Sequence, residues 1–467
     1  MSAVLELRPG MRLDPLPTAL PRPSGPMDPA AEAALRFGSV AAAAVHPFEV
    51  AAAIEAEGVT DRQVQRRYGR SDAFELAEEL YAETPRSYPE PRAAVSPWHS
   101  PLSTGVLRGC LYALPGLAFP LGAPMLSGRP DAGGLPHGTF ALALSVLLNW
   151  AWNQALAHRT HARLGRGQRR SGGCCLFRGA LVGTVLGLLG ALAGVLAAGH
   201  DGAGVLLFCA GQSLYLGASC VLLVLGRERL LLRALAPAAL GGAAVLLGLF
   251  RPTPWTALLL FCTLMLTLRQ ARRELRACLA DRDGDSAVEP LPPLRSSLPH
   301  GLFGMAMSLL TLGIALRGGH LDLGPMVALT ISMGPAEWLL YGYRNRIHGA
   351  LRAARTARGF ALLSARSMAV GLAGYLALLA VLGGAAGAAD AGDPLWSQLP
   401  GLLAVGATIW TALLLQAFGL AWAAAAVCTP AAAATLAGAT EPAVGAVAAG
   451  LLLAIACWSL GRVTVHR

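Results

Sequence analysis

One acidic residue, Glu337, stands inside a long apolar run, GPAEWLLY, of this chain. A charged side chain within a lipid bilayer is energetically costly, so a residue of this kind is by default a candidate for function. Glu337 could couple movement to a proton or cation, act as a gate partner, or snorkel or form a structural ion pair. The structural partners in reach would be Arg108, Arg344 or Arg346.

A second polar group follows helical spacing in the run LNWAWNQ, at Asn149, Asn153 and Gln154. These amides could line a cavity, as could Gln212 in a later apolar run. The alternative is hydrogen bonding between helices, with the two tryptophans beside them forming part of an interfacial aromatic belt. The candidates for transport or gating are therefore Glu337, Arg108, Asn149, Asn153, Gln154 and Gln212.

The residue types exclude several chemistries. All thirty-seven basic residues are Arg, and a phosphate-binding P-loop, a retinal site and a pyridoxal phosphate site each need a lysine. The nine cysteines form no CxxC pair and have no His at zinc-ligand spacing. We expect no metal, no cofactor and no enzyme; a membrane glycosyltransferase is a poorer alternative, because only isolated acids such as Asp131 lie in predicted outer loops.

Composition indicates a polytopic, all-α membrane protein. Apolar residues make up 54% of the chain, charged residues 14%, and the mean hydropathy is +0.52. At about twenty residues per crossing, the apolar runs predict about twelve transmembrane helices. The predicted spans are 104–126, 138–157, 176–199, 203–225, 231–250, 253–268, 301–317, 322–341, 366–388, 398–416, 419–438 and 442–461. The predicted membrane halves are 104–268 and 300–467, joined by a cytoplasmic linker over 269–299.

Arginines alternate between the predicted loops, which sets an orientation. Five lie between Arg159 and Arg170, three between Arg227 and Arg233, and five between Arg344 and Arg358, whereas the intervening loops are nearly bare. Cytoplasmic loops carry the excess of positive charge. The pattern predicts that both termini lie in the cytoplasm, with anionic membrane lipids as partners. The use of Arg without Lys, with abundant Ala and Gly, suggests a GC-rich bacterial genome such as an actinobacterium's, so we expect the membrane to be the bacterial plasma membrane.

The two membrane halves look alike. The segment ALSVLLNWAWNQALAHR (143–159) aligns without a gap with ALTISMGPAEWLLYGYR (328–344), and RGALVG (from Arg178) aligns with RSMAVG (from Arg366). Six crossings per half give both halves the same orientation, so the repeats would be parallel and related by an axis along the membrane normal. The alternative is convergent low complexity in an Ala- and Leu-rich chain.

This 6+6 topology resembles the multidrug and oligosaccharide or polysaccharide flippase superfamily over residues 104–461, and the major facilitators less closely. The resemblance implies two six-helix lobes around a central cavity that opens alternately to each side of the membrane. The chain departs from that pattern in its acidic N-terminal extension of about a hundred residues and in the few charged residues of its predicted cavity.

The N-terminal extension has its own organisation. Residues 1–28 are Pro-rich and predicted to be disordered, residues 29–84 are predicted to form a cytosolic three-helix unit, and residues 85–103 a Pro-rich linker. Thr60 and Gln63 form a capping box for one helix, and Ser71 is predicted to cap the next.

The segment GVTDRQVQRRYG resembles the recognition part of a helix-turn-helix, but the extension holds ten Arg against fourteen acids. Net negative charge disfavours nucleic acid, so we expect residues 29–83 to dock cytosolic proteins instead. The docking candidates are Phe48, Arg66, Arg67, Tyr68 and Phe74. The unit also resembles that of actinobacterial membrane proteins of uncertain role.

Two functional hypotheses follow. The first is a flippase-like exporter of a lipid-linked saccharide, a polysaccharide or a small molecule, which uses Glu337 and a central cavity. The second is a membrane scaffold that does not transport and recruits division or envelope-assembly proteins through its N-terminal unit.

Overall fold

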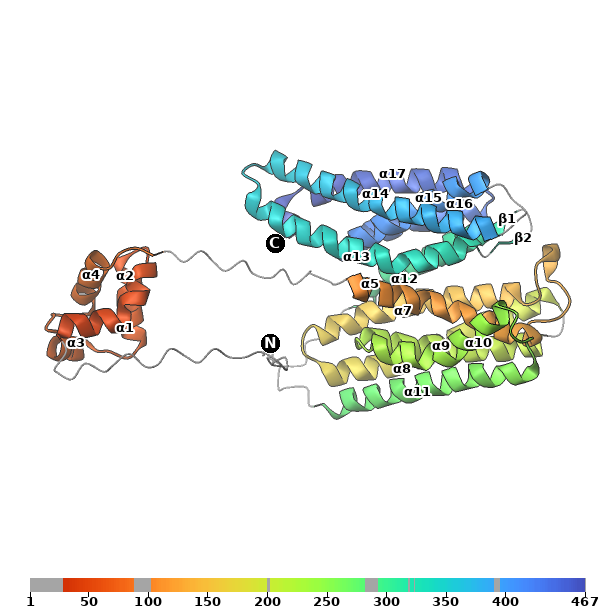
Figure 1. Cartoon of the computed structure of the whole chain (residues 1–467), viewed down its shortest axis with the longest axis horizontal. Coiled ribbons are helices and arrows are strands. Elements are labelled where there is room, and N and C mark those ends of the chain that lie inside the picture. Colours follow the sequence, from red (N-terminus) through yellow and green to blue (C-terminus); the bar gives the residue numbers. More distant parts are fainter. Residues whose placement is uncertain are drawn as a thin grey trace. The chain divides into compact units, whose positions relative to one another are not determined.

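The computed structural model describes residues 28–87, 102–199, 202–281, 293–317, 320–322, 324–389 and 395–466. The chain divides into two compact units, residues 1–95 and 96–467 (Figure 1). Residues 1–27 of the predicted tail, most of the linker over 85–103 and part of the linker over 269–299 lie outside the described residues.

The N-terminal unit contains four helices rather than three. They are α1 (Pro29–Ala43), α2 (Pro47–Ala56), α3 (Asp61–Tyr68) and α4 (Ala73–Glu83). The additional helix, α1, buries Ala33, Phe37 and Ala41, which recur every four residues and so share one face. These side chains join Val50, Ile54 and others in a core that belongs to this unit alone.

Of the two helix caps predicted for this unit, one is confirmed and one is corrected. The Gln63 side chain accepts a hydrogen bond from the Thr60 N–H at 2.9 Å, as the capping box predicts. The helix α4, however, is capped by Asp72 and not by Ser71. The Asp72 carboxylate accepts the N–H groups of Phe74 and Glu75, both at 2.9 Å, because it stands directly before the first helical residue.

The second unit is almost entirely helical. Its first half contains α5 (Leu102–Ala113), η1 (Leu114–Leu117), α6 (Ala118–Gly122), η2 (Ala123–Met125), η3 (Ala132–Gly134), α7 (Thr139–Leu164), α8 (Arg169–Ala198), α9 (Ala203–Val224), α10 (Glu228–Leu246), η4 (Pro254–Thr256) and α11 (Ala257–Ala280). Its second half contains α12 (Leu294–Ala315), β1 (Leu316–Arg317), β2 (His320–Leu321), α13 (Gly324–Ala353), α14 (Ala357–Ala389), α15 (Leu395–Ala417), α16 (Ala421–Leu436), α17 (Glu441–Leu460) and η5 (Val463–His466). The two short strands pair antiparallel.

The multi-pass helical character predicted from composition is confirmed. Within the described residues, nine helical stretches are long and apolar enough to cross a membrane, and α16 is a shorter apolar helix. Each of the twelve predicted spans overlaps a described helix, but α11, α13 and α16 are not among the nine. Twelve crossings therefore stay a prediction.

Several helices extend well beyond the apolar runs, and this corrects the predicted linker over 269–299. The helix α11 continues to Ala280, and α12 begins at Leu294 and includes Pro299. The extension of α11 buries Ala271, Leu275 and Cys278 at helical spacing. Packing on this stripe keeps the segment helical although its other face carries arginines.

The halves α5–α11 and α12–α17 lie side by side (Figure 1). Their principal contacts are two helix pairs: α5 packs on α13, and α7 packs on α12. We call these two pairs the seams. Within the first half, α7 packs mainly on α8, and within the second half, α13 packs mainly on α14.

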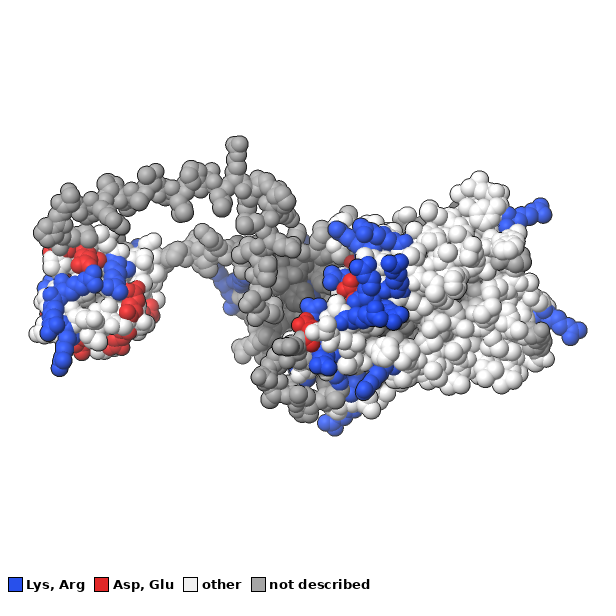
Figure 2. Space-filling view, turned by 90° about the horizontal axis from the view of Figure 1, so that it is seen from below, with Lys and Arg blue, Asp and Glu red and all other residues white. Residues whose placement is uncertain are grey.

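Arginines gather at one end of this unit, while the lateral face seen in Figure 2 is nearly free of charge. This arginine-rich end is formed by the turns between α7 and α8, α9 and α10, and α13 and α14, together with the end of α11. A charge-free lateral surface between a charged end and a nearly uncharged one suits a protein that crosses a bilayer.

Candidate functional site

The seam between α5 and α13 is a close contact of glycines. A Cβ added at Gly334 of α13 would lie 2.2 Å from the Gly105 carbonyl oxygen and 2.4 Å from the Gly109 nitrogen of α5. Only hydrogen fits there, so the two backbones approach far more closely than larger residues would allow.

This close approach brings charges of the two halves together. The Arg108 guanidinium donates to Glu337 on α13, and its Nε donates to Glu228 on α10 at 2.6 Å. Arg108 is about a quarter exposed, and Glu337 30% exposed. Of the structural partners considered from sequence, Arg108 is the one that bonds to Glu337. Glu228, at the start of α10, is a member of the cluster that sequence reasoning missed.

The cluster is a three-residue ionic bridge across the border of the halves. Two carboxylates flank one guanidinium, so Arg108 is the residue on which the arrangement depends. The bridge lies toward the arginine-rich end, because Glu228 is the first residue of α10. It joins the two halves at that end of the seam.

The second seam, between α7 and α12, is also lined by small residues. A Cβ added at Gly301 would lie 3.5 Å from the Ala155 Cβ, and one at Gly304 would lie 2.9 Å from the Gln154 Cγ. Gln154, a predicted transport candidate, therefore lies at the border of the halves.

Two histidines, which the sequence analysis did not select, stack in this seam. The rings of His158 and His300 have centroids 4.0 Å apart, and the His158 Nδ1 lies 3.2 Å from the Ser297 Oγ. The two residues are far apart in the chain, and nothing in their spacing links them.

The remaining amide candidates lie inside the first half rather than in the seams. Asn149 is fully buried, and its Nδ2 donates to the Ser145 carbonyl at 2.9 Å and to the Ser213 Oγ of α9 at 3.1 Å. The Asn153 Oδ1 and Gln212 Oε1 are buried and, within the described residues, have no bonded partner. For Asn149, the geometry matches the interhelical alternative.

Asp131 has a structural role. Its two carboxylate oxygens accept the N–H groups of Gly138 and Phe140, at 3.1 and 3.0 Å, where α7 begins. Within the described residues, no three His, Cys, Asp or Glu side chains come together as metal ligands do.

Two of the predicted docking residues form an exposed aromatic pair on the N-terminal unit. Phe48 of α2 and Phe74 of α4 are 60% and 49% exposed, and their rings meet edge to face with centroids 5.8 Å apart. Tyr68, in contrast, is 4% exposed and belongs to the core. It is unavailable to a partner, which corrects the prediction.

The two arginines of the predicted docking set differ. Arg67 forms an ion pair with Glu32 of α1, so it ties α3 to α1. Arg66 is exposed. Of the five predicted docking residues, Phe48, Phe74, Arg66 and Arg67 are exposed, and Arg67 is in addition held by Glu32.

Carboxylates of this unit have perturbed acidities. The N–H groups of Glu75 and Phe74 hold the pKa of Asp72 below its ordinary value, and the Arg70 guanidinium lowers the pKa of Glu79. Hydrogen bonds to the charged form are the cause in both cases.

Comparison with protein families, curated proteins and solved structures finds no match.

Proposed function

We propose that this protein is a flippase-like exporter, in which two parallel six-helix halves rock against each other along the seams. The cargo would be a lipid-linked saccharide, a polysaccharide or another small molecule. The observation that carries the proposal is the bond between Arg108 and Glu337, a partly exposed ion pair that joins the two halves.

The pattern of helix contacts supports a repeat. Taken in chain order, α5 corresponds to α12, α7 to α13, and so on to α11, which corresponds to α17. Under this correspondence, the contact of α5 with α13 is equivalent to the contact of α12 with α7, which is the second seam. The same correspondence turns α7 with α8 into α13 with α14, and α9 with α11 into α15 with α17. Each of these pairs packs together, as parallel repeats about an axis between them require.

The seams support movement. Small residues give two helices a smooth contact without interlocked large side chains, as at Gly105, Gly109 and Gly334. Alternating access in transporters with repeats is largely a rigid rocking of one half against the other. The ionic bridge of Arg108 would close the arginine-rich end in one state and open in the other.

We place the arginine-rich end in the cytoplasm of a bacterium and the protein in its plasma membrane, since positive charge accumulates on that side. Both termini would then be cytoplasmic. The ionic bridge would act as a cytoplasmic gate.

Complementation of a null strain tests the proposal. The strain receives either the Glu337→Gln variant or a chain that lacks residues 1–90. The amount of each variant in the membrane is measured alongside growth. An exporter should lose rescue with Glu337→Gln and tolerate the truncation. The opposite result would mean that the membrane unit chiefly anchors the chain.

A scaffold is the second candidate, and the exposed contact of Phe48 with Phe74 favours it. Aromatic residues that protrude into solvent are typical anchors of protein interfaces. Phe48→Ser with Phe74→Ser should abolish rescue if docking of cytosolic partners is the activity. As a control, Leu35→Ser removes another exposed apolar side chain of the same unit.

A further inference from the structure

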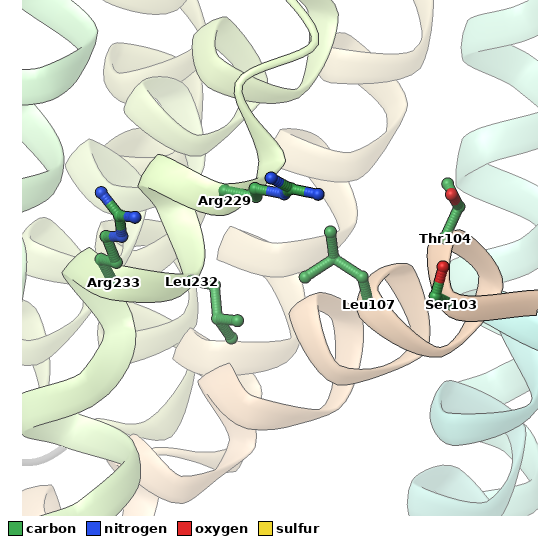
Figure 3. Close-up of a pocket in the computed structure, with 6 residues that line it drawn as sticks. All are labelled: Ser103, Thr104, Leu107, Arg229, Leu232 and Arg233. Carbon is green, nitrogen blue, oxygen red and sulfur yellow. The ribbon is translucent and has the colours of Figure 1, made fainter. Parts of the chain in front are cut away.

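A cleft of about 400 Å³ lies between the start of α5 and the start of α10, at the arginine-rich end (Figure 3). Its lining consists of Ser103, Thr104, Leu107, Arg229, Leu232 and Arg233. The two arginines stand four residues apart on α10, so they share one face of the helix. Two hydroxyls come from α5, and two leucines lie between the polar groups.

The arginines of the cleft differ from their neighbours in pairing. Arg227 pairs with Glu274 at 2.8 Å, and Arg108 is held by Glu228 and Glu337. Among the residues that the structure describes, neither Arg229 nor Arg233 has a carboxylate within ion-pair distance. The nearest acid in sequence, Glu228, is already bonded to Arg108. Arg229 and Arg233 are thus left without an ion-pair partner among the described residues.

We infer that this cleft binds a phosphate ester. Arginine presents a planar set of donors that matches phosphate oxygens, and hydroxyls of Ser and Thr complete such sites. In Figure 3, Arg229 extends from α10 toward the α5 side, where Ser103 and Thr104 lie. A phosphate between them would meet donors from both helices.

The apolar part of the cleft indicates what the phosphate is attached to. Leu107 and Leu232 are half-buried and line the same space. They offer a surface for the glycerol and first carbons of a lipid, beside charges that suit its headgroup. Free phosphate and an anionic lipid both present the phosphate group that the arginines would bind. Only the lipid also has apolar atoms that can contact the two leucines. The inference does not depend on transport.

Native mass spectrometry of the full-length protein from phosphatidylcholine nanodiscs tests the site, with phosphatidylglycerol as the probe. Arg229→Gln with Arg233→Gln should weaken phosphatidylglycerol retention about tenfold or more. The matched control, Arg352→Gln with Arg358→Gln, removes two exposed arginines of the same end that do not line the cleft and should retain the lipid as the wild type does.

Inorganic phosphate at millimolar concentration distinguishes the two sources. Displacement of the lipid means that the phosphate group alone suffices, while retention means that the apolar surface contributes. Either result supports the site, provided that the arginine variant is impaired. Equal retention by the arginine variant and the control, or no preference of the wild type for phosphatidylglycerol over phosphatidylcholine, would overturn it.

A milder variant covers a failure of the double variant to fold. Arg229→Lys with Arg233→Lys keeps both charges and loses the planar donor geometry, so binding should weaken several-fold with an unchanged melting temperature. Retention equal to wild type in this folded variant would exclude recognition by the guanidinium groups.

Discussion

Arg108 on α5 bonds to Glu337 on α13, and the same guanidinium bonds to Glu228 on α10 at 2.6 Å. One cation therefore serves two carboxylates from two helices. Removing the cation leaves two like charges close together, whereas removing Glu337 leaves Arg108 still paired.

This asymmetry predicts unequal losses of stability. Arg108→Gln should lower the free energy of unfolding by roughly 1–3 kcal/mol, less than for a fully buried pair because the group is about a quarter exposed. Glu337→Gln should cost under about 1 kcal/mol. Thermal unfolding in one detergent measures both variants. Equal losses would mean that Glu228 does not share the cation.

The glycine contact of the first seam should tolerate no side chain. Gly334→Ala places a methyl group against the backbone of Gly105 and Gly109, so it should destabilise the protein by roughly 1–3 kcal/mol. Gly349→Ala on the same helix is the control, because a Cβ there meets nothing within 4 Å. Similar melting temperatures for the two variants would contradict the close approach of α5 and α13.

Asn149 should behave as a packing residue. Asn149→Ala removes hydrogen bonds to Ser145 and Ser213 and should lower stability by about 1 kcal/mol or more. Rescue of the null strain should persist, in contrast to Glu337→Gln. Loss of rescue at unchanged stability and membrane amount would assign Asn149 to the transport path instead.

The N-terminal unit should lose stability in acid. The folded unit lowers the pKa values of Asp72, Glu75 and Glu79, so their contribution is present above the unfolded pKa values and is lost as the pH falls through the folded ones. Melting of residues 28–87, which have their own core, should therefore move to lower temperature from about pH 4.5 downward. Asp72→Asn should weaken the dependence. The ordinary pKa values of carboxyl groups lie between about pH 5 and pH 3. A melting temperature independent of pH over this range would contradict the lowered pKa values of the three carboxylates.

The helical, multi-pass class and the positions of the apolar helices could be predicted from the sequence, because the length and hydropathy of the apolar runs determine them. The extension of α11 to Ala280 could not be predicted in this way, because arginines stand between its buried residues Ala271, Leu275 and Cys278 in the sequence. Apolar content finds membrane crossings and misses the amphipathic ends of the same helices.

The site was predictable in part. Glu337 and Arg108 stood out because charges are rare in apolar runs, and their pairing was among the alternatives. Glu228 and the stack of His158 on His300 depend on tertiary packing between distant segments, which no local pattern encodes. Tyr68 was predicted as a docking residue because it stands beside arginines in the sequence. Its position on α3 instead directs its side chain toward the core of the N-terminal unit.

Rocking of the two halves changes the distance between them, and distances between spin labels measure this change. The measurement uses a cysteine-free chain in nanodiscs. Labels at Arg276→Cys and Arg358→Cys report the distance between the halves, and labels at Arg358→Cys and Arg462→Cys report a distance within the second half. All three sites are exposed. We expect Glu337→Gln to shift the first distribution to longer distances and to leave the second unchanged. A first distribution as narrow as the second, and unaffected by Glu337→Gln, would mean that the halves do not rock against each other.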